Sequence, residues 1–215
     1  MLKSRLSTSS VLSLVSDMAL NLIAPQSDEY HLALGRFVHA FSEIENAVQI
    51  LLSHKAGVSN EKAKAIFSGV TIKTAVEHIQ RLFEVDGQEV PTYLKGALSH
   101  LGVIISVRND ILHFGANLDV ETLELYVTNE RSSIPRKITK TLVSAKYLDD
   151  MRADLFGITS AILHVILADH GAGDNVLSVY LKDASSPWRY KRIQPSKSPG
   201  KTRRSGAKSP HPPKS

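Results

Sequence analysis

Cysteine is absent from the 215-residue chain, which excludes disulfide bridges, thiolate metal sites and cysteine catalysis. Aromatic residues make up only 6%, so a hydrophobic core has to consist mainly of Leu, Ile, Val and Ala. This balance favours packed helices over a sheet sandwich. No run of 18 or more apolar residues occurs, so we expect no transmembrane helix and no membrane partner. A cysteine-free chain fits a reducing compartment, and we expect a cytoplasmic protein.

Motifs for metals and cofactors are missing as well. The nine histidines include no His-x-x-x-His pair, so we predict no metal site. The chain also lacks a glycine-rich loop that would cradle phosphates and a serine nucleophile elbow. We therefore expect no cofactor.

Acidic residues are missing from the C-terminal end of the chain. The net charge is +5, but residues 185–215 hold nine Lys and Arg and no Asp or Glu. Residues 1–184 hold 17 basic and 21 acidic residues, so they are mildly acidic. We predict an N-terminal arm at 1–27, either flexible or a short amphipathic helix. A helical domain is expected at 28–184 and a basic, disordered tail at 185–215.

Apolar residues at spacings of three and four predict a bundle of four or five helices. The expected helices cover about 28–54, 59–68, 71–85, 91–113 and 144–169. The fourth is apolar on most sides, so we expect it at the centre of the bundle. Alternating residues at 120–127 and 137–143 predict a β-hairpin inserted before the last long helix. The predicted fold class is therefore mainly α with a small hairpin.

A polar cluster ends the fourth helix, where Arg108, Asn109 and His113 close an apolar segment. Asn109 and His113 are four residues apart and share a helix face, whereas Arg108 lies about 140° from His113. A guanidinium stabilises charge on phosphate oxygens, an imidazole exchanges a proton near neutral pH, and an amide can orient either group. These residue types suit a metal-free attack on phosphate if the helix end frays or a second subunit completes the site.

The sequence Arg-Asn-x-x-x-His at the end of a long helix, followed by Gly115, resembles the signature of HEPN domains. That family consists of all-helical bundles, usually homodimers, and many members are metal-independent endoribonucleases of toxin–antitoxin and antiphage systems. In the family, the arginine and histidine of two subunits line a cleft where the RNA 2′-OH attacks the adjacent phosphate. The resemblance implies that Arg108 and His113 form the catalytic pair. We assign Asn109, which shares the helix face of His113, as the catalytic residue that orients the pair. It also implies RNA, a second copy of the chain and an antitoxin protein as partners.

The resemblance extends to the first helix. The segment Phe37–Glu45 is similar to the opening helix of HEPN-like proteins, in which an acidic residue lies near the motif. We assign that role to Glu45, with Glu43 as the competitor. The β-hairpin is a departure from the plainest helical form of the family.

A structural interpretation of the same residues stands beside the catalytic one. Asp110 could pair with an arginine, and His113 could cap carbonyls at the helix C-terminus. The chain would then be a catalytically inactive HEPN-like adaptor, or an unrelated bundle. In the tail, Trp188 and Tyr190 either stack on bases or dock the start of the tail on the domain, and we favour docking. A further possibility is that the basic tail coats nucleic acid.

Overall fold

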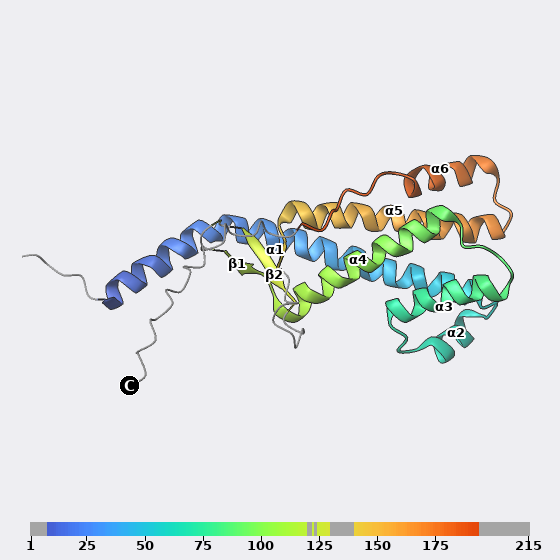
Figure 1. The fold of residues 1–215 in the computed structure, drawn as a ribbon, viewed down its shortest axis with the longest axis horizontal. Coiled ribbons are helices and arrows are strands. Elements are labelled where there is room, and N and C mark those ends of the chain that lie inside the picture. Colours follow the sequence, from blue (N-terminus) through green and yellow to red (C-terminus); the bar gives the residue numbers. More distant parts are fainter. Residues whose placement is uncertain (1–7, 120–121, 123, 130–139, 194–215) are drawn as a thin grey trace, which may run out of the picture.

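The computed structural model describes residues 8–119, 122, 124–129 and 140–193, with side chains from Asp28 onward except that of Asn60. This part of the chain forms six helices and a small sheet (Figure 1). The helices are α1 (Thr8–Lys55), α2 (Asn60–Phe67), α3 (Ile72–Val85), α4 (Thr92–Phe114), α5 (Ala145–Asp169) and α6 (Asp174–Ala184). The prediction of a mainly helical fold with a small β element before the last long helix is confirmed.

The core lies where α1, α4 and α5 pack together, with α3 covering one end of α1. The buried stripe of α1 includes Phe37, Phe41, Ile44, Val48 and Leu51, at the expected three- and four-residue spacing. The expectation of α4 at the centre is wrong, because α5 packs against α1, α4 and α6. Both α4 and α5 are apolar on most sides, so their composition does not show which of the two lies at the centre of the bundle.

Two helices differ from the sequence prediction. α1 begins at Thr8, whereas the acidic residues at Asp28 and Glu29 indicated a start there. Acidic side chains favour a first turn but are tolerated inside a helix, so they do not fix where it begins. α6 is an additional helix that follows Gly171 and Gly173. It escaped prediction because it is short and mostly exposed, which leaves a weak apolar pattern.

The sheet has three antiparallel strands, β1 (Asn117–Leu118), β2 (Leu125–Thr128) and β3 (Lys140–Leu142), in that order. The pairing of β2 with β3 confirms the predicted hairpin. β1 is an addition, because the sequence analysis predicted no strand at Asn117–Leu118. Val127 is fully buried against the core, so the sheet closes the bundle at the C-terminal end of α4. Residues 130–139 of the predicted hairpin lie outside the described residues.

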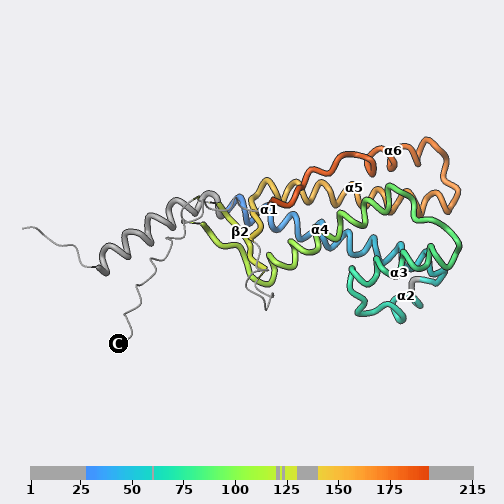
Figure 2. The backbone as a smooth tube through the Cα atoms, in the orientation of Figure 1, coloured from blue at the N-terminus to red at the C-terminus, as the bar shows by residue number. Residues whose placement is uncertain are grey.

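Residues 185–193, here called the strap, run back from α6 along the bundle toward the sheet (Figure 2). Within the strap, Tyr190 is 2% exposed and the Trp188 ring stacks on the His100 ring. Docking of Trp188 and Tyr190 is therefore confirmed, although the predicted boundary at Ser185 places both residues in the tail. The rest of the predicted tail, residues 194–215, lies outside the described residues.

Among the described residues, α5 is the one helix long and apolar enough to cross a membrane by length and composition. Half of its most apolar 18-residue window is buried inside the bundle. The same pattern is found in the core helix of a soluble bundle, and here α5 packs against three other helices. A cytoplasmic location stays a prediction.

Candidate active site at the end of helix α4

Arg108 is held in place by two neighbours near the end of α4. Its Nη1 donates a hydrogen bond to Oδ1 of Asn109 at 3.2 Å. Its Cζ lies 4.8 Å from the centre of the Phe41 ring on α1, a cation–π contact. The side chain is half-buried, so the guanidinium is oriented by the protein and still reaches solvent. The structure thus brings Asn109 to Arg108, whereas the sequence placed Asn109 on the helix face of His113.

His113 lies apart from this pair, on the exposed last turn of α4. Its ring is 6.3 Å from the ring of Phe114, and within the described part of the chain it makes no hydrogen bond to a carbonyl. Gly115, at φ 68°, ends the helix, and its N–H donates to the carbonyl of Ile111 at 2.9 Å. The helix therefore stays regular through Phe114. Neither capping by His113 nor fraying of the helix end is observed, so one chain alone does not bring His113 to Arg108.

Asp110 is 8% exposed and pairs with an arginine, as the structural interpretation expected. The partner comes from the strap: Nη2 of Arg192 lies 3.8 Å from Oδ2 of Asp110. Nε of Arg192 also donates to Oγ1 of Thr141 on β3 at 3.1 Å. The motif is thus connected to both the sheet and the C-terminal strap.

The two candidate glutamates lie on opposite flanks of α1. Glu45 follows Phe41 by one helical turn, so it shares the flank on which Arg108 lies. No hydrogen bond or ion pair joins Glu45 to Arg108 in the described chain. Glu43 faces the other flank, where Nε2 of His39 lies 3.6 Å from its carboxylate. The geometry therefore favours Glu45 over Glu43 as the neighbour of the motif.

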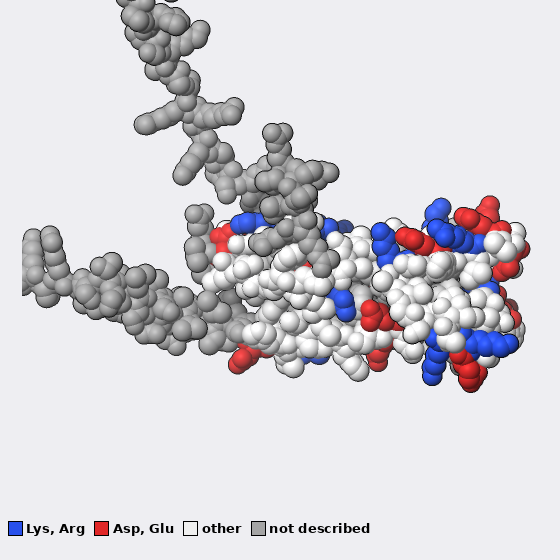
Figure 3. Space-filling view, turned by 90° about the horizontal axis from the view of Figure 1, so that it is seen from below, with Lys and Arg blue, Asp and Glu red and all other residues white. Residues whose placement is uncertain are grey.

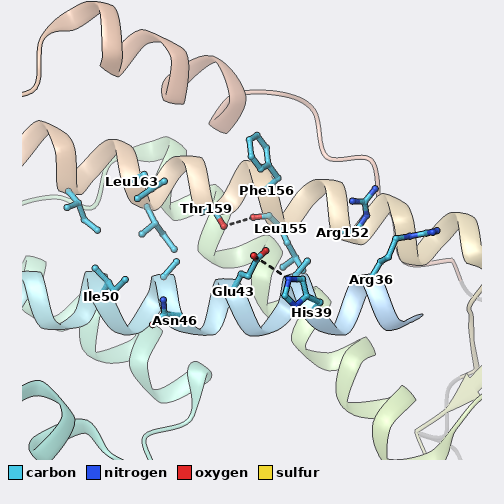
Figure 4. A pocket seen from close by; sticks show the side chains of 14 residues that line it. Arg36, His39, Glu43, Asn46, Ile50, Arg152, Leu155, Phe156, Thr159 and Leu163 are labelled. Atoms are coloured by element: carbon cyan, nitrogen blue, oxygen red, sulfur yellow. Dashed lines mark hydrogen bonds and ion pairs between the residues drawn. The ribbon is translucent and has the colours of Figure 1, made fainter. Parts of the chain in front are cut away.

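A groove of about 610 Å³ runs along that other flank, between α1 and α5 (Figure 4). Arg36, His39 and Glu43 line it from α1, and Arg152 and Phe156 line it from α5. Neither Arg108 nor His113 lines it. The groove and the motif are therefore separate features of the surface.

A second polar cluster, here called the clasp, was not predicted from the sequence. Nε2 of His100 on α4 lies 2.8 Å from Oδ2 of Asp154 on α5, and the Trp188 ring stacks on His100 with centroids 4.6 Å apart. Asp154 also accepts the backbone N–H groups of Arg189 and Tyr190, each at 2.8 Å. His100 and Asp154 are 54 residues apart, and each lies in an ordinary helical pattern, so no local signal reveals the pair.

The clasp has the atoms of a catalytic dyad but the surroundings of a structural one. The side chain of Asp154 is 3% exposed and that of His100 is 11% exposed. Both carboxylate oxygens of Asp154 are occupied by donors from the chain itself. The clasp therefore fixes the strap, because a buried carboxylate needs such donors.

No three His, Asp or Glu side chains gather as a metal site would require in the described part of the chain. Charged side chains are also unevenly placed on the face in Figure 3. They gather at the end where α2 and α3 lie, and the middle of this face shows few of them. No protein-family model, curated protein or solved structure matches the chain.

Proposed function

We propose that the chain is a metal-independent endoribonuclease of the HEPN type, in which two copies bring Arg108 and His113 to one phosphate. The observation that carries the proposal is the guanidinium of Arg108, which Asn109 and the Phe41 ring hold in a half-exposed position. A cation oriented before the substrate binds stabilises developing charge without a reorganisation cost. His113 is exposed nearby, where it can meet a substrate or a second copy.

The chemistry needs a base, an acid and a cation. His113 accepts the proton of the RNA 2′-OH, whose oxygen attacks the adjacent phosphorus. The O2′–P bond forms while the P–O5′ bond breaks, and the same His113, now protonated, gives that proton to the departing 5′ oxygen. Arg108 stabilises the charge on the phosphate oxygens through paired hydrogen bonds. The products are a 2′,3′-cyclic phosphate and a 5′-hydroxyl.

The dimer is the condition on which this mechanism depends. Arg108 and His113 are five residues apart on a regular helix, so their side chains leave α4 about 140° apart. A two-fold contact between copies can place Arg108 of one copy opposite His113 of the other. The proposal therefore includes a homodimer.

The direct test incubates the full chain with single-stranded RNA in the presence of EDTA. We expect cleavage by the wild type, and a loss of about 10²–10⁴-fold in His113→Ala, the range typical of a general acid or base. Arg152→Ala and His39→Ala, which change exposed side chains of the separate groove, serve as matched controls and should cleave normally. Equal cleavage by wild type and His113→Ala would contradict the proposal.

A mixing experiment tests whether the site is shared. Arg108→Ala and His113→Ala are each inactive alone, but a mixed dimer keeps one complete Arg108 and His113 pair. Random exchange between equal amounts should restore about a quarter of the wild-type rate, because half of the dimers are mixed and each holds one intact site. No recovery after verified subunit exchange would rule out a site shared in this way.

A role as a toxin or defence component follows from the same proposal. Overexpression in cells should arrest growth, and either Arg108→Ala or His113→Ala should relieve the arrest. An antitoxin protein would bind the active chain and suppress the arrest. Growth arrest that persists unchanged in both variants would separate toxicity from RNA cleavage.

A second candidate is a catalytically inactive HEPN-like adaptor, and one observation favours it. Each of the first three motif residues has a partner inside the described chain: Arg108 on Phe41 and Asn109, and Asp110 with Arg192. For this adaptor, Arg108→Ala should lower the melting temperature or break the dimer, and neither protein should cleave RNA. An Arg108→Ala protein that is fully stable and dimeric would argue against the adaptor.

A further inference from the structure

Most of the side chains that line the groove between α1 and α5 are apolar. On α5, Leu155 is buried and Phe156 beside it is 65% exposed. Figure 4 shows Arg36 and Arg152 at one end of the groove and Ile50 at the other. Arg36 and Ile50 are 14 residues apart on α1, which is about 21 Å of helix. A groove of this length between two helices fits a third helix of three to four turns.

Helix α6 carries an exposed stripe of matching size. Val176, Val179 and Asp183 follow one another at spacings of three and four, so they share one face of the helix. Val176 is 41% exposed and Val179 is 58% exposed, whereas Ala184 is buried and α6 packs on α5. The eleven residues of α6 make about 16 Å of helix. The stripe therefore fits within the length of the groove.

The charges of the two surfaces are complementary. Nη2 of Arg36 lies 3.2 Å and Nε of Arg152 lies 3.4 Å from the carboxylate of Asp149, so two guanidiniums share one carboxylate. This end of the groove has one positive charge in excess, while Glu43 lies further along, beside His39. α6 holds two aspartates and one lysine, so it has one negative charge in excess. Opposite charges of this kind fix the orientation of two docked surfaces.

The spacing of residues on the two helices also matches. Phe156 follows Arg152 by four residues on α5, and Val179 precedes Asp183 by four residues on α6. A helix antiparallel to α5 therefore brings Asp183 to Arg152 and Val179 to Phe156 at the same time. The apolar pair and the charged pair support the same arrangement.

We propose that this groove binds α6 of a second copy of the chain, antiparallel to α5. α5 packs against both α1 and α6, so the groove and α6 are neighbours on the surface of one copy. A two-fold axis then lets each copy donate its α6 and receive that of its partner. The contact covers Phe156, Val176 and Val179, which one copy leaves exposed to water.

The inference does not rest on the proposed function. Neither Arg108 nor His113 lines the groove, so this contact is distinct from the contact at α4 that RNA cleavage requires. A chain that forms both two-fold contacts assembles into more than two copies. The two contacts can therefore be broken one at a time.

Cross-linking between two single-cysteine proteins tests the contact directly, because the native chain has no cysteine. In the antiparallel register, Val176 lies opposite Thr159, since each is three residues beyond the pair of Val179 and Phe156. The Thr159→Cys protein and a mass-tagged Val176→Cys protein are mixed and mildly oxidised. We expect a joined product at least about tenfold above that of a control in which Val85→Cys, an exposed position on α3, replaces Thr159→Cys. Equal yields would overturn the proposal.

Charged substitutions test whether the contact holds copies together. Phe156→Glu and Val179→Glu each place a carboxylate in an apolar contact, and both side chains are exposed in one copy, so the fold should be kept. We expect the dissociation constant between copies, measured by analytical ultracentrifugation, to rise at least about tenfold in each variant. Val85→Glu is the matched control and should leave this constant unchanged. An unchanged constant in both variants would overturn the proposal.

Charge reversal tests the antiparallel register. Asp183→Arg and Arg152→Asp each put like charges together across the contact and should weaken association about three- to tenfold, because the two-fold axis repeats the change. The double variant restores opposite charges and should recover most of the wild-type affinity, which a folding defect would not do. Absence of recovery in a folded double variant would overturn the proposed arrangement.

RNA cleavage separates this inference from the proposed function. If Phe156→Glu breaks up the assembly but the wild type never cleaves RNA, the enzymatic proposal fails and the groove contact stands. If the wild type cleaves RNA and Phe156→Glu leaves its mass unchanged, the groove contact fails and the enzyme stands. A wild type that stays a single copy at every concentration would overturn both proposals and leave the groove for a different protein.

Discussion

Two histidines of α4 are in opposite situations. His100 is only 11% exposed, hydrogen-bonded to Asp154 and covered by Trp188. His113 lies thirteen residues further on, exposed on the last turn, and it makes no hydrogen bond within the described residues. Both histidines belong to α4. Their difference indicates that a buried histidine–carboxylate pair, whose two carboxylate oxygens both accept hydrogen bonds from the chain, serves structure, whereas an exposed imidazole can reach a substrate.

Among substitutions that test this difference between the two histidines, we expect Asp154→Ala to have the largest effect on stability. It removes a buried carboxylate that accepts three hydrogen bonds, and leaves His100 and two backbone N–H groups without their acceptor. We expect a loss of about 3–5 kcal/mol in the free energy of unfolding, measured by urea denaturation. Asp150→Ala, which removes a partner of the exposed Lys146, should cost less than about 0.5 kcal/mol. Equal losses would mean that the clasp contributes little to stability.

A smaller effect on stability is expected from replacing each histidine. His100→Ala should cost about 1–3 kcal/mol, because it leaves the carboxylate of Asp154 with an unfilled site and removes the platform under Trp188. His113→Ala should change stability by less than about 0.5 kcal/mol, since it removes an exposed side chain that makes no hydrogen bond to the described residues. Thermal unfolding of the two proteins side by side measures the difference. A larger loss in His113→Ala would reverse the structural and functional assignments.

A comparison of Glu43 and Glu45 on α1 tests which of the two acts together with the motif. Glu45→Gln removes a charge on the flank where Arg108 lies and should slow RNA cleavage about three- to tenfold, or about 1 kcal/mol. Glu43→Gln changes an exposed side chain, 69% accessible, that faces the groove, and should leave the rate unchanged. Single-turnover cleavage rates compare the pair. A greater effect of Glu43→Gln would show that Glu43, on the other flank of α1, is the acidic residue that acts with the motif.

The smallest effect at neutral pH is expected from Tyr190→Phe, at the strap end of the clasp. The hydroxyl of Tyr190 is buried and has no hydrogen-bond partner in the part of the chain that the structure describes, so its removal should change stability by less than about 0.5 kcal/mol near pH 7. Burial raises the pKa of Tyr190 to about 12, although Arg192 lowers it slightly. An unfolded tyrosine ionises near pH 10.

The direction of the pH effect follows from these two values. The folded state keeps the Tyr190 proton between about pH 10 and 12, whereas the unfolded state releases it. The wild type should therefore lose stability as the pH rises through this window, by an amount that Tyr190→Phe does not lose. Urea denaturation of both proteins at pH 8, 10 and 11 measures the difference. Parallel curves would show that the pKa of Tyr190 is not raised.

Much of the fold could be predicted because it follows local rules. The three- and four-residue spacing on α1 predicted which side chains are buried, and Ser59, Thr71 and Ser144 mark helix starts through their side-chain oxygens. α6 and β1 were missed because short, exposed elements carry little apolar pattern. The start of α1 at Thr8 was missed because Asp28 and Glu29 indicated a first helical turn, whereas acidic residues also occur inside a helix.

The candidate site could be predicted only in part. The pairing of Arg108 with Asn109 follows from adjacent residues, whereas its packing on Phe41 joins helices that are distant in the sequence. The choice of Glu45 over Glu43 required knowing on which flank of α1 the helix α4 lies, and only the structure shows this. The arginine that pairs with Asp110 comes from the strap, 82 residues further along the chain, and no local pattern announces it.

The sequence by itself determined the residue types of the motif, their order on one helix and the charge contrast between an acidic body and a basic C-terminal segment. These properties depend on composition and on spacings of a few residues. Only the tertiary structure decided that His100 is structural and His113 exposed, and that the strap carries the chain to the motif. The reason is physical: burial and hydrogen-bond partners are set by which helices meet, and that depends on the packing of the whole core.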